Sequence, residues 1–385
     1  MPKTPRAEPG APAATPAGPV RSGTWSAPGR VNLIGDHTDY NAGFALPFAL
    51  PLRTTATARA RDDATVTATS TGHEPIRFTT DTRPGEVSGW GAYVAGVVWA
   101  LSRHLGGTVP GFDVDLTSQI PRGSGLSSSH SLECALALAV LDLAGAELST
   151  AELALLIQRA ENDYVGAPTG LLDQTAILAS QEGHLSFFDA RDQSVEPVPC
   201  DFAAAGLSVL VIDPHSPHSL VDGAYAARRT ACERAAARLG VATLREVEDP
   251  VAALAALEDP EMVRRVRHVL TENARVLACV DLARQGRLAE IGPLLTRSHE
   301  SMRQDFESSV PTIDLVVETA VAAGALGARM TGGGFGGAVV ALVQRGRVAD
   351  VEATVAEATE ATGLPAPAFL DVLPSRGAGR DAAAT

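Results

Sequence analysis

Several short stretches of this sequence gather polar side chains and glycines at spacings that suit small-molecule chemistry. The first is PGRVNLIGDHTDYNAG, residues 28–43, in which Arg30, Asp36, His37 and Asp39 lie close together along the chain. Carboxylates and an imidazole recognise sugar hydroxyls through directional hydrogen bonds, so the cluster could line a sugar-binding concavity. A turn rich in Asp and Asn, with its charges in solvent, would explain the same composition.

A second stretch, IPRGSGLSSSHSLECALALAV at residues 120–140, places two glycines and three serines before a long apolar segment. Such a turn at the start of a helix presents free backbone N–H groups and the positive end of the helix dipole, which together favour an anion. The turn is not a Walker A loop, because no lysine follows the glycines. Nor is it a dinucleotide-binding fingerprint, because Ser128 stands in place of the third glycine. An ordinary serine-capped helix is the alternative.

Two further stretches complete the candidate chemistry. RMTGGGFGGAVVALV, which starts at Arg329, has five glycines in six positions and favours a loop with positive φ angles or very close backbone approach. AENDYVGAPTGLLDQ, residues 160–174, places Glu161 at the end of a predicted helix and Asp173 after a Gly/Pro loop. The Asp173 carboxylate could orient or deprotonate a hydroxyl in phosphoryl transfer, or it could cap the helix that follows.

The charged residues exclude several chemistries. Of the 31 basic residues counted as Lys and Arg, only Lys3 is a lysine. A Walker A lysine, a protein-kinase strand lysine and a Schiff base are therefore excluded from the folded part, so bound phosphates would need backbone N–H groups, arginine and a metal. The net charge of −14, with no visible basic stripe, argues against nucleic-acid binding. The 4 cysteines are scattered and form no C-x-x-C pair, which favours buried reduced thiols over structural zinc.

The elements that must position these residues mix strands and helices without a regular alternation. Alternating patterns predict strands between residues 24 and 70 and at 112–120, and an apolar run predicts a buried strand at 207–213. Helical spacing is found at 89–105, at 131–145 and at 149–166, where Ser149 or Thr150 is the expected N-cap and Glu152 the partner of a capping box. This mixture favours an α+β fold over a doubly wound sheet.

Composition divides the chain into four parts. We expect a disordered Pro/Ala-rich lead at 1–23, an N-terminal sugar- and ATP-binding domain at 24–200, a C-terminal domain at 201–375 and a flexible tail at 376–385. No apolar run approaches the roughly 18 residues of a membrane span. Because the start of the chain also lacks the apolar core of a secretory signal, we expect a cytoplasmic protein without a membrane partner.

Taken in order, these stretches resemble the signature motifs of the GHMP small-molecule kinases, and the first is similar to the sugar-binding signature of the galactokinases within that family. GRVNLIGDHTDYNAGFALP matches this signature almost residue for residue, PRGSGLSSS resembles the phosphate loop, TGLLDQ the catalytic segment and GARMTGGGFGGAVV the third glycine motif. The similarity extends from about Trp25 to Leu373. It implies a two-domain α+β fold, with an N-terminal domain like domain 2 of ribosomal protein S5, a ferredoxin-like C-terminal GHMP domain, and the active site between them.

The resemblance implies an activity and a set of site residues. The activity is ATP-dependent phosphorylation of the anomeric hydroxyl of α-D-galactose to galactose 1-phosphate, in galactose catabolism by the Leloir pathway, by a monomer that uses ATP and Mg²⁺. The residue matching the catalytic aspartate is Asp173, as base or orienting group, with Arg30 lowering its pKa. The implied sugar ligands are Asp36, His37, Asp39, Gly170 and Tyr225. The implied ATP site consists of Trp90, for which a role in the core is the alternative, and of Gly123, Ser124, Gly125, Leu126, Ser127, Ser128 and Ser129. The implied magnesium ligands are Ser129 and Glu161.

Three positions depart from the family pattern. Asp36 stands where galactokinases usually have glutamate, and its shorter arm predicts looser tolerance at the distal end of the sugar, with galactose still the substrate. His130 replaces a small residue, so it either packs outward or adds a pH-dependent charge near the phosphates. Pro217 replaces a residue that is often basic.

Two other functions compete with this one. A related kinase could act on N-acetylgalactosamine or arabinose, but the unbroken HTDYN segment favours plain galactose. A non-catalytic galactose sensor is the other alternative. It is disfavoured because the serines of the phosphate loop, Glu161 and Asp173 are all present.

Overall fold

The structure, a computed structural model, describes residues 20–167, 169–216 and 221–382. Its first half is built on a six-stranded sheet in the order β13-β1-β3-β6-β4-β5, in which only the β4–β6 pair is parallel. The strands of this sheet are β1 (Ser22–Asn32), β3 (Pro47–Ala60), β4 (Thr65–Ser70), β5 (Ile76–Thr79), β6 (Phe112–Ser118) and β13 (Gly379–Arg380). Alternation along β3 explains its pairing: Ala56 and Ala58 are buried, whereas Thr57 between them is exposed.

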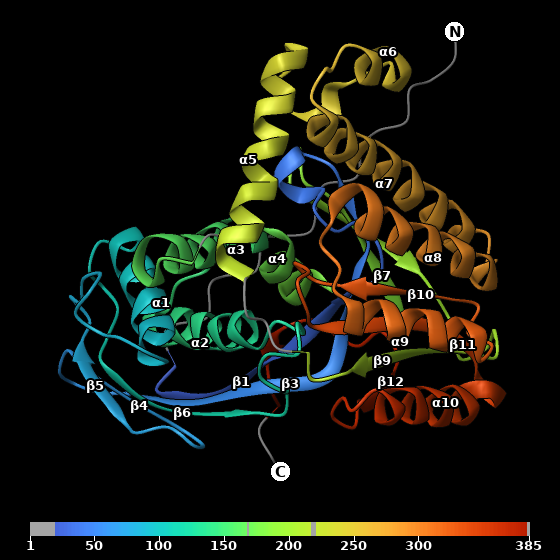
Figure 1. The fold of residues 1–385 in the computed structure, drawn as a ribbon. Helices are drawn as coiled ribbons and strands as arrows, with labels where there is room; N and C mark the ends of the chain where they lie inside the picture. Colours follow the sequence, from blue (N-terminus) through green and yellow to red (C-terminus); the bar gives the residue numbers. More distant parts are fainter. Residues whose placement is uncertain (1–19, 168, 217–220, 383–385) are drawn as a thin grey trace, which may run out of the picture.

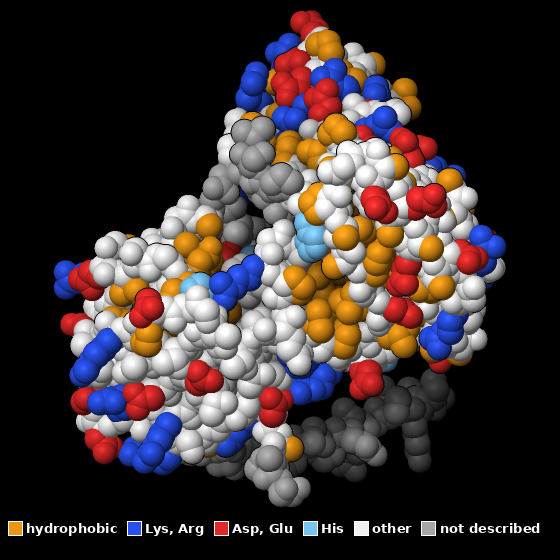
Figure 2. Space-filling model, turned by 60° about the horizontal axis from the view of Figure 1, so that its bottom comes forward, with side chains coloured by type: hydrophobic (Ala, Val, Ile, Leu, Met, Phe, Trp, Pro, Cys, Tyr) orange, Lys and Arg blue, Asp and Glu red, His pale blue; other side chains and the backbone are white. Residues whose placement is uncertain are grey.

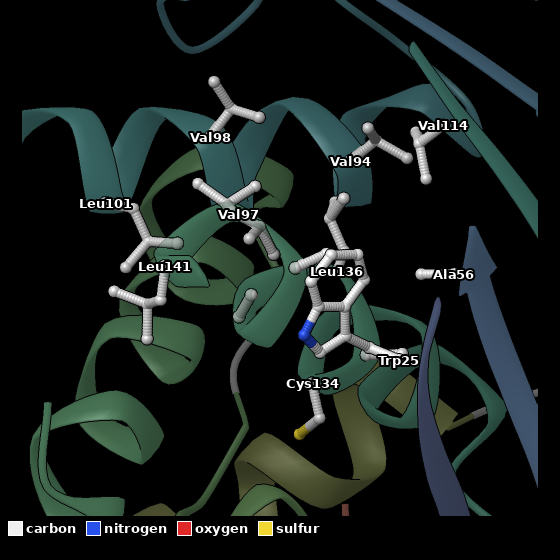
Figure 3. Packing of buried hydrophobic residues seen from close by; sticks show 14 of the residues in the cluster. Trp25, Ala56, Val94, Val97, Val98, Leu101, Val114, Cys134, Leu136 and Leu141 are labelled. Carbon is white, nitrogen blue, oxygen red and sulfur yellow. The ribbon is translucent and has the colours of Figure 1, made fainter. Parts of the chain in front are cut away.

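Helices cover one face of this sheet (Figure 1). They are α1 (Gly91–His104), α2 (Ser128–Ala144), α3 (Thr150–Arg159) and α4 (Leu172–Ala179), with a π-helical turn, η2 (Ala160–Val165), directly after α3. Figure 3 shows Trp25 of β1 packed among Val94 and Val97 of α1 and Leu136 of α2. The capping box expected at the start of α3 is confirmed, because Ser149 and Glu152 each bond the other's backbone N–H.

The second half contains a four-stranded antiparallel sheet in the order β10-β11-β9-β12. Its strands are β9 (Leu207–Asp213), β10 (Gly327–Thr331), β11 (Ala338–Gln344) and β12 (Ala368–Val372), with α9 (Pro311–Ala322) before β10 and α10 (Val348–Ala361) before β12. Numbered along the chain, the strands lie in the order 2-3-1-4, with helices between the first and second and between the third and fourth. This is the ferredoxin-like arrangement that the sequence predicted.

The remaining elements lie between or above these two sheets (Figure 1). A small sheet joins β2 (Phe44–Ala45), β7 (His184–Asp189) and β8 (Ser194–Pro199). The helices are α5 (Val221–Leu239), α6 (Pro250–Ala255), α7 (Pro260–Arg284) and α8 (Gly292–Ser301), and the shorter turns are η1 (Asp39–Asn41), η3 (Leu244–Glu246), η4 (Leu288–Ile291), η5 (Met302–Phe306) and η6 (Arg345–Arg347).

The two halves share a core, which fixes the position of one against the other. Val31 and Phe48 of the first sheet belong to the same buried cluster as Val209, Val276 and Leu342 of the second half. The mixed antiparallel sheets and helices confirm the α+β fold class. Among the described residues, no helix is both long enough and apolar enough to cross a membrane.

Both chain ends differ from the sequence-based boundaries. Strand β1 already begins at Ser22, inside the predicted lead, and residues 1–19 lie outside the described part. The predicted flexible tail is wrong for residues 376–382, because β13 pairs with β1 and Arg376 contacts Asp381 at 2.7 Å. The edge of β1 has backbone groups that need partners, and the tail supplies them. The predicted boundary at residue 200 falls between β8 and β9.

Candidate active site

One cavity of about 280 Å³ lies at the junction of the two halves. It is lined by Arg30, Asp36, His37, Asp39, His130, Ala167, Thr169, Gly170, Leu172, Asp173, Tyr225, Gly332 and Gly333. All the residues predicted to bind a sugar are in this lining, together with the proposed catalytic pair Arg30 and Asp173. Figure 2 shows one face of the molecule, with two lobes, a hollow between them, and acidic and basic side chains interspersed over both.

At the wall of this cavity, Arg30 of β1 holds Asp173 of α4 in a bidentate ion pair. The Nε and Nη2 atoms of Arg30 donate hydrogen bonds to the two carboxylate oxygens, at 2.6 and 2.5 Å. The Ser127 hydroxyl donates a third hydrogen bond, at 2.5 Å. Burial has the largest single effect and would raise the pKa of Asp173, but the charges of Arg30 and His130 and the hydrogen bonds from Arg30 and Ser127 together outweigh it and lower this pKa to about 2. Asp173 is therefore ionised at every physiological pH.

The phosphate-loop candidate lies directly beside this pair. Gly125 and Ser127 have φ angles of 74° and 58°, in the left-handed region, so the loop curls tightly before α2 begins. Arg30 is bonded to the loop twice, by its backbone N–H to the Leu126 carbonyl at 3.2 Å and by Nη1 to the Gly125 carbonyl at 2.7 Å. No side chain caps the first turn of α2, because the Ser127 hydroxyl is bonded to Asp173. The N–H groups of this turn therefore suit an anion.

The third glycine motif forms the loop between β10 and β11 and lies beside Gly125 of the phosphate-loop candidate. Gly332, Gly334, Gly336 and Gly337 all have positive φ, as the sequence predicted for this run. At Gly333, an added Cβ would stand 3.4 Å from the Tyr225 ring, an ordinary contact distance, so this loop also lies against α5.

At the far end of the cavity, Asp36 is held by two protein groups. Its Oδ1 accepts a hydrogen bond from the Asn32 side chain at 2.9 Å, and its Oδ2 pairs with Arg329 at 2.5 Å. Arg329 is fully buried and also contacts Ser298. Burial raises the pKa of Asp36 despite the nearby Arg329 charge. Both carboxylate oxygens of Asp36 thus already have partners within the protein.

The buried His37 and the half-buried Asp39 lie next to it. His37 has a positive φ of 62°, and its ring lies among Tyr40, Tyr225 and Phe306. Burial lowers its pKa well below the usual value, so the ring is neutral, and its Nε2 has no hydrogen-bond partner among the described residues. This atom is available to a bound hydroxyl.

Asp39 and Gly170 lie against each other in the lining of the cavity. Burial raises the pKa of Asp39 to about 6, and the nearby carboxylates of Asp173 and Asp36 add to the increase. A Cβ at position 170 would overlap the Asp39 carboxylate, so a larger residue there would displace this carboxylate from its position. A carboxylate that is half ionised near pH 6 makes this end of the cavity sensitive to pH.

His130 points inward, which corrects one of the two sequence-based interpretations of this residue. Its Nε2 lies 2.9 Å from Oε2 of Glu161, and its Nδ1 lies 3.5 Å from Oδ2 of Asp173. Burial would lower the pKa of His130, but the two carboxylates outweigh it and raise this pKa. Glu133 lies next to Glu161, and its pKa is raised well above the usual value by burial and by the Glu161 charge.

The predicted magnesium ligands are compatible with the ion. Glu161 is buried in the π-helical turn, a feature common at functional sites, and its Oε2 has no hydrogen-bond partner among the described residues. Ser129 lies in the first turn of α2, beside the anion-binding N–H groups. A carboxylate and a hydroxyl are oxygen ligands of the kind that Mg²⁺ takes alongside phosphates.

The cavity lining does not include the predicted residues 123–129, Glu161 or Trp90. Trp90 stacks on His73, with ring centroids 5.1 Å apart, and its indole N–H donates to the Glu74 carbonyl at 3.1 Å. Its proposed contact with adenine stays a prediction. Pro217 lies outside the described residues.

Sequence reasoning missed part of the lining. Thr169 and Leu172 flank the predicted Gly170 and Asp173, so their proximity along the chain was an available signal. The ion pair of Arg329 with Asp36 joins two predicted motifs, but no spacing in the sequence indicated it.

Comparison with known proteins gives consistent results along the chain. The model of the GHMP kinases N terminal domain matches residues 92–181, that of the galactokinase galactose-binding signature matches 17–60, and that of the GHMP kinases C terminal domain matches 279–361. The chain is 50% identical to a galactokinase of Streptomyces coelicolor over 93% of its own length and 94% of the relative's. It is 51% identical to a galactokinase of Mycobacterium tuberculosis over 90% and 95% of the two chains.

Solved structures are similar as well. The fold matches that of Lactococcus lactis galactokinase complexed with galactose, with a TM-score of 0.87, 32% identity, and coverage of 93% of this chain and 95% of that one. A mevalonate kinase, at 17% identity and a TM-score of 0.65, shares the fold.

Proposed function

Because this chain belongs to the galactokinase family of GHMP kinases, we propose that it transfers the γ-phosphoryl group of ATP to the anomeric hydroxyl of α-D-galactose. The products are galactose 1-phosphate and ADP, which places the enzyme at the entry of galactose into the Leloir pathway. The observation that carries this proposal is the Arg30–Asp173 pair, which stands between a sugar-sized cavity and an anion-binding loop.

Asp173 acts on the sugar as an ionised acceptor. With a pKa of about 2, it is a weak base, so its main task is to accept the hydrogen bond of the anomeric hydroxyl and point the oxygen at the γ-phosphorus. As the new O–P bond forms, the bond from the γ-phosphorus to the bridging oxygen of ADP breaks. The hydroxyl proton leaves late, once bonding to phosphorus has made it acidic, and passes to the Asp173 carboxylate that accepts its hydrogen bond and from there to solvent. Positioning and charge neutralisation supply most of the catalysis in such a transfer.

The phosphates of ATP lie against backbone groups instead of a lysine. The N–H groups at the start of α2 and the loop at Gly123, Ser124, Gly125 and Leu126 would surround them. Ser129 and Glu161 would hold magnesium, which would neutralise part of the charge of the phosphates. Arg30, already adjacent to the loop, stabilises charge on the transferred group.

The sugar is recognised by groups that differ in charge. The neutral His37 ring and the carboxylate of Asp39 offer hydrogen bonds to hydroxyls, and Tyr225 closes the cavity from α5. Because Arg329 and Asn32 already engage both oxygens of Asp36, this carboxylate binds the distal hydroxyl less tightly than a free one would. We therefore expect the enzyme to accept sugars that are changed at this distal end.

We also propose a cytoplasmic location and a monomeric state. ATP is available in the cytoplasm, and the cavity is complete within one chain, since residues of both halves line it. Light scattering after size-exclusion chromatography tests the state, with a mass near 39.8 kDa expected.

The test of the proposed function is ADP release from Mg-ATP with a panel of sugars. The panel contains galactose, 2-deoxygalactose, galactosamine, N-acetylgalactosamine, arabinose, fucose and glucose. Turnover should be fastest with galactose. A higher kcat/KM for N-acetylgalactosamine or arabinose would overturn the choice of sugar. Binding of galactose and ATP without turnover on any sugar would identify a sensor instead.

A further inference from the structure

Three buried side chains gather at one spot beside the cavity, and the proposed reaction uses only one of them. His130 and Glu133 lie three residues apart on one face of α2, and Glu161 approaches from the π-helical turn η2. Their exposed fractions are 6%, 0% and 2%. One ligand atom from each residue lies within 4.8 Å of the other two.

The polar atoms of this cluster lack hydrogen bonds. Among the described residues, Nε2 of His130, both carboxylate oxygens of Glu133 and Oε2 of Glu161 have no hydrogen-bond partner. Nε2 of His130 and Oε2 of Glu161 lie 2.9 Å apart and form an ion pair when the imidazole is protonated, which leaves the carboxylate of Glu133 as the group without a partner in the described part of the chain. Buried polar groups are rarely left in this state, because an unpaired group has lost its hydrogen bonds to water without replacement.

Nearby basic groups compensate for only part of the charge of these carboxylates. Arg30 is bonded to Asp173 and to the Gly125 carbonyl. Asp173 itself faces His130 from the other side, at 3.5 Å from Nδ1. The imidazole of His130 can balance one carboxylate, so the second carboxylate of the cluster must be neutralised by a proton or offset by a bound cation.

We propose that His130, Glu133 and Glu161 bind a divalent transition-metal ion, for which Mn²⁺ is the probe. The 2.9 Å spacing of the His130 nitrogen and the Glu161 oxygen suits two neighbouring ligands that each lie about 2.1 Å from one ion. An imidazole nitrogen beside two carboxylates favours Mn²⁺, Co²⁺ or Zn²⁺ over Mg²⁺, which prefers oxygen ligands and retains its waters.

This site differs from the one proposed for magnesium. That ion would use Ser129 and Glu161 and would depend on the phosphates of ATP, whereas the His130 site is formed by protein side chains alone. The two sites share only Glu161. The inference does not rest on phosphorylation of galactose, so it survives if another sugar is the substrate.

The experiment uses the full chain, freed of metal by a chelator, without nucleotide or sugar. Mn²⁺ is titrated and the free ion is followed by electron paramagnetic resonance, and pulsed measurements of the bound ion report coupling to ¹⁴N. We expect saturable binding of one ion for each chain, with the coupling of one imidazole nitrogen.

Variants separate the three ligands. His130→Ala should remove the nitrogen coupling and weaken Mn²⁺ binding by about tenfold or more, and Glu133→Gln should weaken binding by a similar factor while the coupling persists. His104→Ala, at an exposed histidine of α1, is the matched control and should change neither. Thermal melting checks that each variant is folded, and His130→Gln replaces His130→Ala if the smaller side chain prevents folding.

Two results would overturn the site. One is the absence of saturable Mn²⁺ binding by the nucleotide-free chain, which would mean that protons alone offset the charge of the cluster. The other is ¹⁴N coupling that persists without His130. Because neither measurement involves a sugar, failure of the site and failure of the proposed kinase activity are distinguishable.

Discussion

Arg30 and Asp173 lie 143 residues apart in the sequence, and two hydrogen bonds of 2.6 and 2.5 Å join them side by side. The two hydrogen bonds involve both oxygens of the carboxylate and two nitrogens of the guanidinium. Its consequence is a carboxylate of fixed direction and fixed charge, placed where the sugar cavity meets the phosphate loop. An acceptor in this state can orient a hydroxyl without waiting for a change of protonation.

Replacing Arg30 tests this coupling. In the wild type, Asp173 with its pKa of about 2 loses its charge only far below neutral pH, so its titration should not affect kcat above about pH 4. Arg30→Lys keeps a charge but loses the bidentate geometry, and we expect kcat to fall by about 10²-fold. Because the pKa of Asp173 should rise in Arg30→Lys, kcat of this variant should also begin to fall at acidic pH. Arg284→Lys, at an exposed ion pair, is the control. An unchanged profile in Arg30→Lys would refute the coupling.

Replacing Asp39 by asparagine should weaken the binding of galactose but stabilise the fold. Its folded pKa of about 6 lies above its unfolded value of 3.8, so the folded chain binds more protons between these values and stability declines as the pH rises through that window. At pH 7.5, Asp39→Asn should therefore stabilise the fold by about 1–3 kcal/mol. The same change should raise the KM for galactose.

Urea denaturation and initial rates at pH 5.5 and 7.5 measure the two effects. The stabilisation in Asp39→Asn should be smaller at pH 5.5, where the wild-type carboxyl is largely protonated. Asp281→Asn, at an exposed position of α7, should change neither quantity. Equal stabilisation at both pH values would contradict the pKa assigned to Asp39.

Asp36→Glu tests tolerance at the distal end of the sugar. A longer arm can reach the sugar while it still contacts Arg329, so discrimination between galactose and its 6-deoxy analogue should increase, by about three- to tenfold in the ratio of kcat/KM values. Galactose should remain the substrate of both forms. Identical ratios in the two proteins would show that Asp36 does not determine this tolerance.

Arg329 is expected to be a major stabilising residue. It is fully buried and pairs with Asp36 at 2.5 Å, so Arg329→Gln leaves the buried Asp36 carboxylate without its cation, whereas Glu272 keeps its 2.8 Å pair with Arg275. We expect a loss of about 3–5 kcal/mol in the free energy of unfolding at pH 7.5. This loss should shrink toward pH 5, because the pKa of Asp36 is already raised and rises further without Arg329.

Urea denaturation of Arg329→Gln beside Arg303→Gln measures this difference. Arg303 forms exposed ion pairs with Asp314 and Glu318, which contribute little, typically about 0–1 kcal/mol. Similar losses in the two variants would exclude the buried network as a source of stability.

The residues of the cavity were predictable because local patterns marked them. A glycine-rich run must be a loop, a serine-rich turn before an apolar segment must begin a helix, and the resemblance joined these loops into one site. The ferredoxin-like arrangement of the second half was expected only from the resemblance, since the local patterns indicated no more than an α+β mixture. Pairings over long distances were not: Arg329 meets Asp36 across 293 residues, and β13 completes the first sheet from the far end of the chain.

The direction of the His130 side chain could not be predicted from the sequence, for a second reason. On a helix, one residue of offset decides between solvent and core, and the start of α2 is set by the left-handed turn at Ser127. The inward direction of His130, and its meeting with Glu161 in a π-helical turn, depend on backbone details that composition does not encode.

The most direct test combines product analysis with binding. Wild type and Asp173→Asn are incubated with Mg-ATP and galactose, the products are identified by ³¹P and ¹H nuclear magnetic resonance, and galactose affinity is measured by calorimetry. We predict phosphate on the anomeric oxygen of α-galactose with the wild type. For Asp173→Asn we predict galactose binding within a few-fold of the wild type but a rate at least about 10³-fold lower. Phosphate on another oxygen, or an Asp173→Asn rate close to that of the wild type, would contradict the role assigned to the Arg30–Asp173 pair.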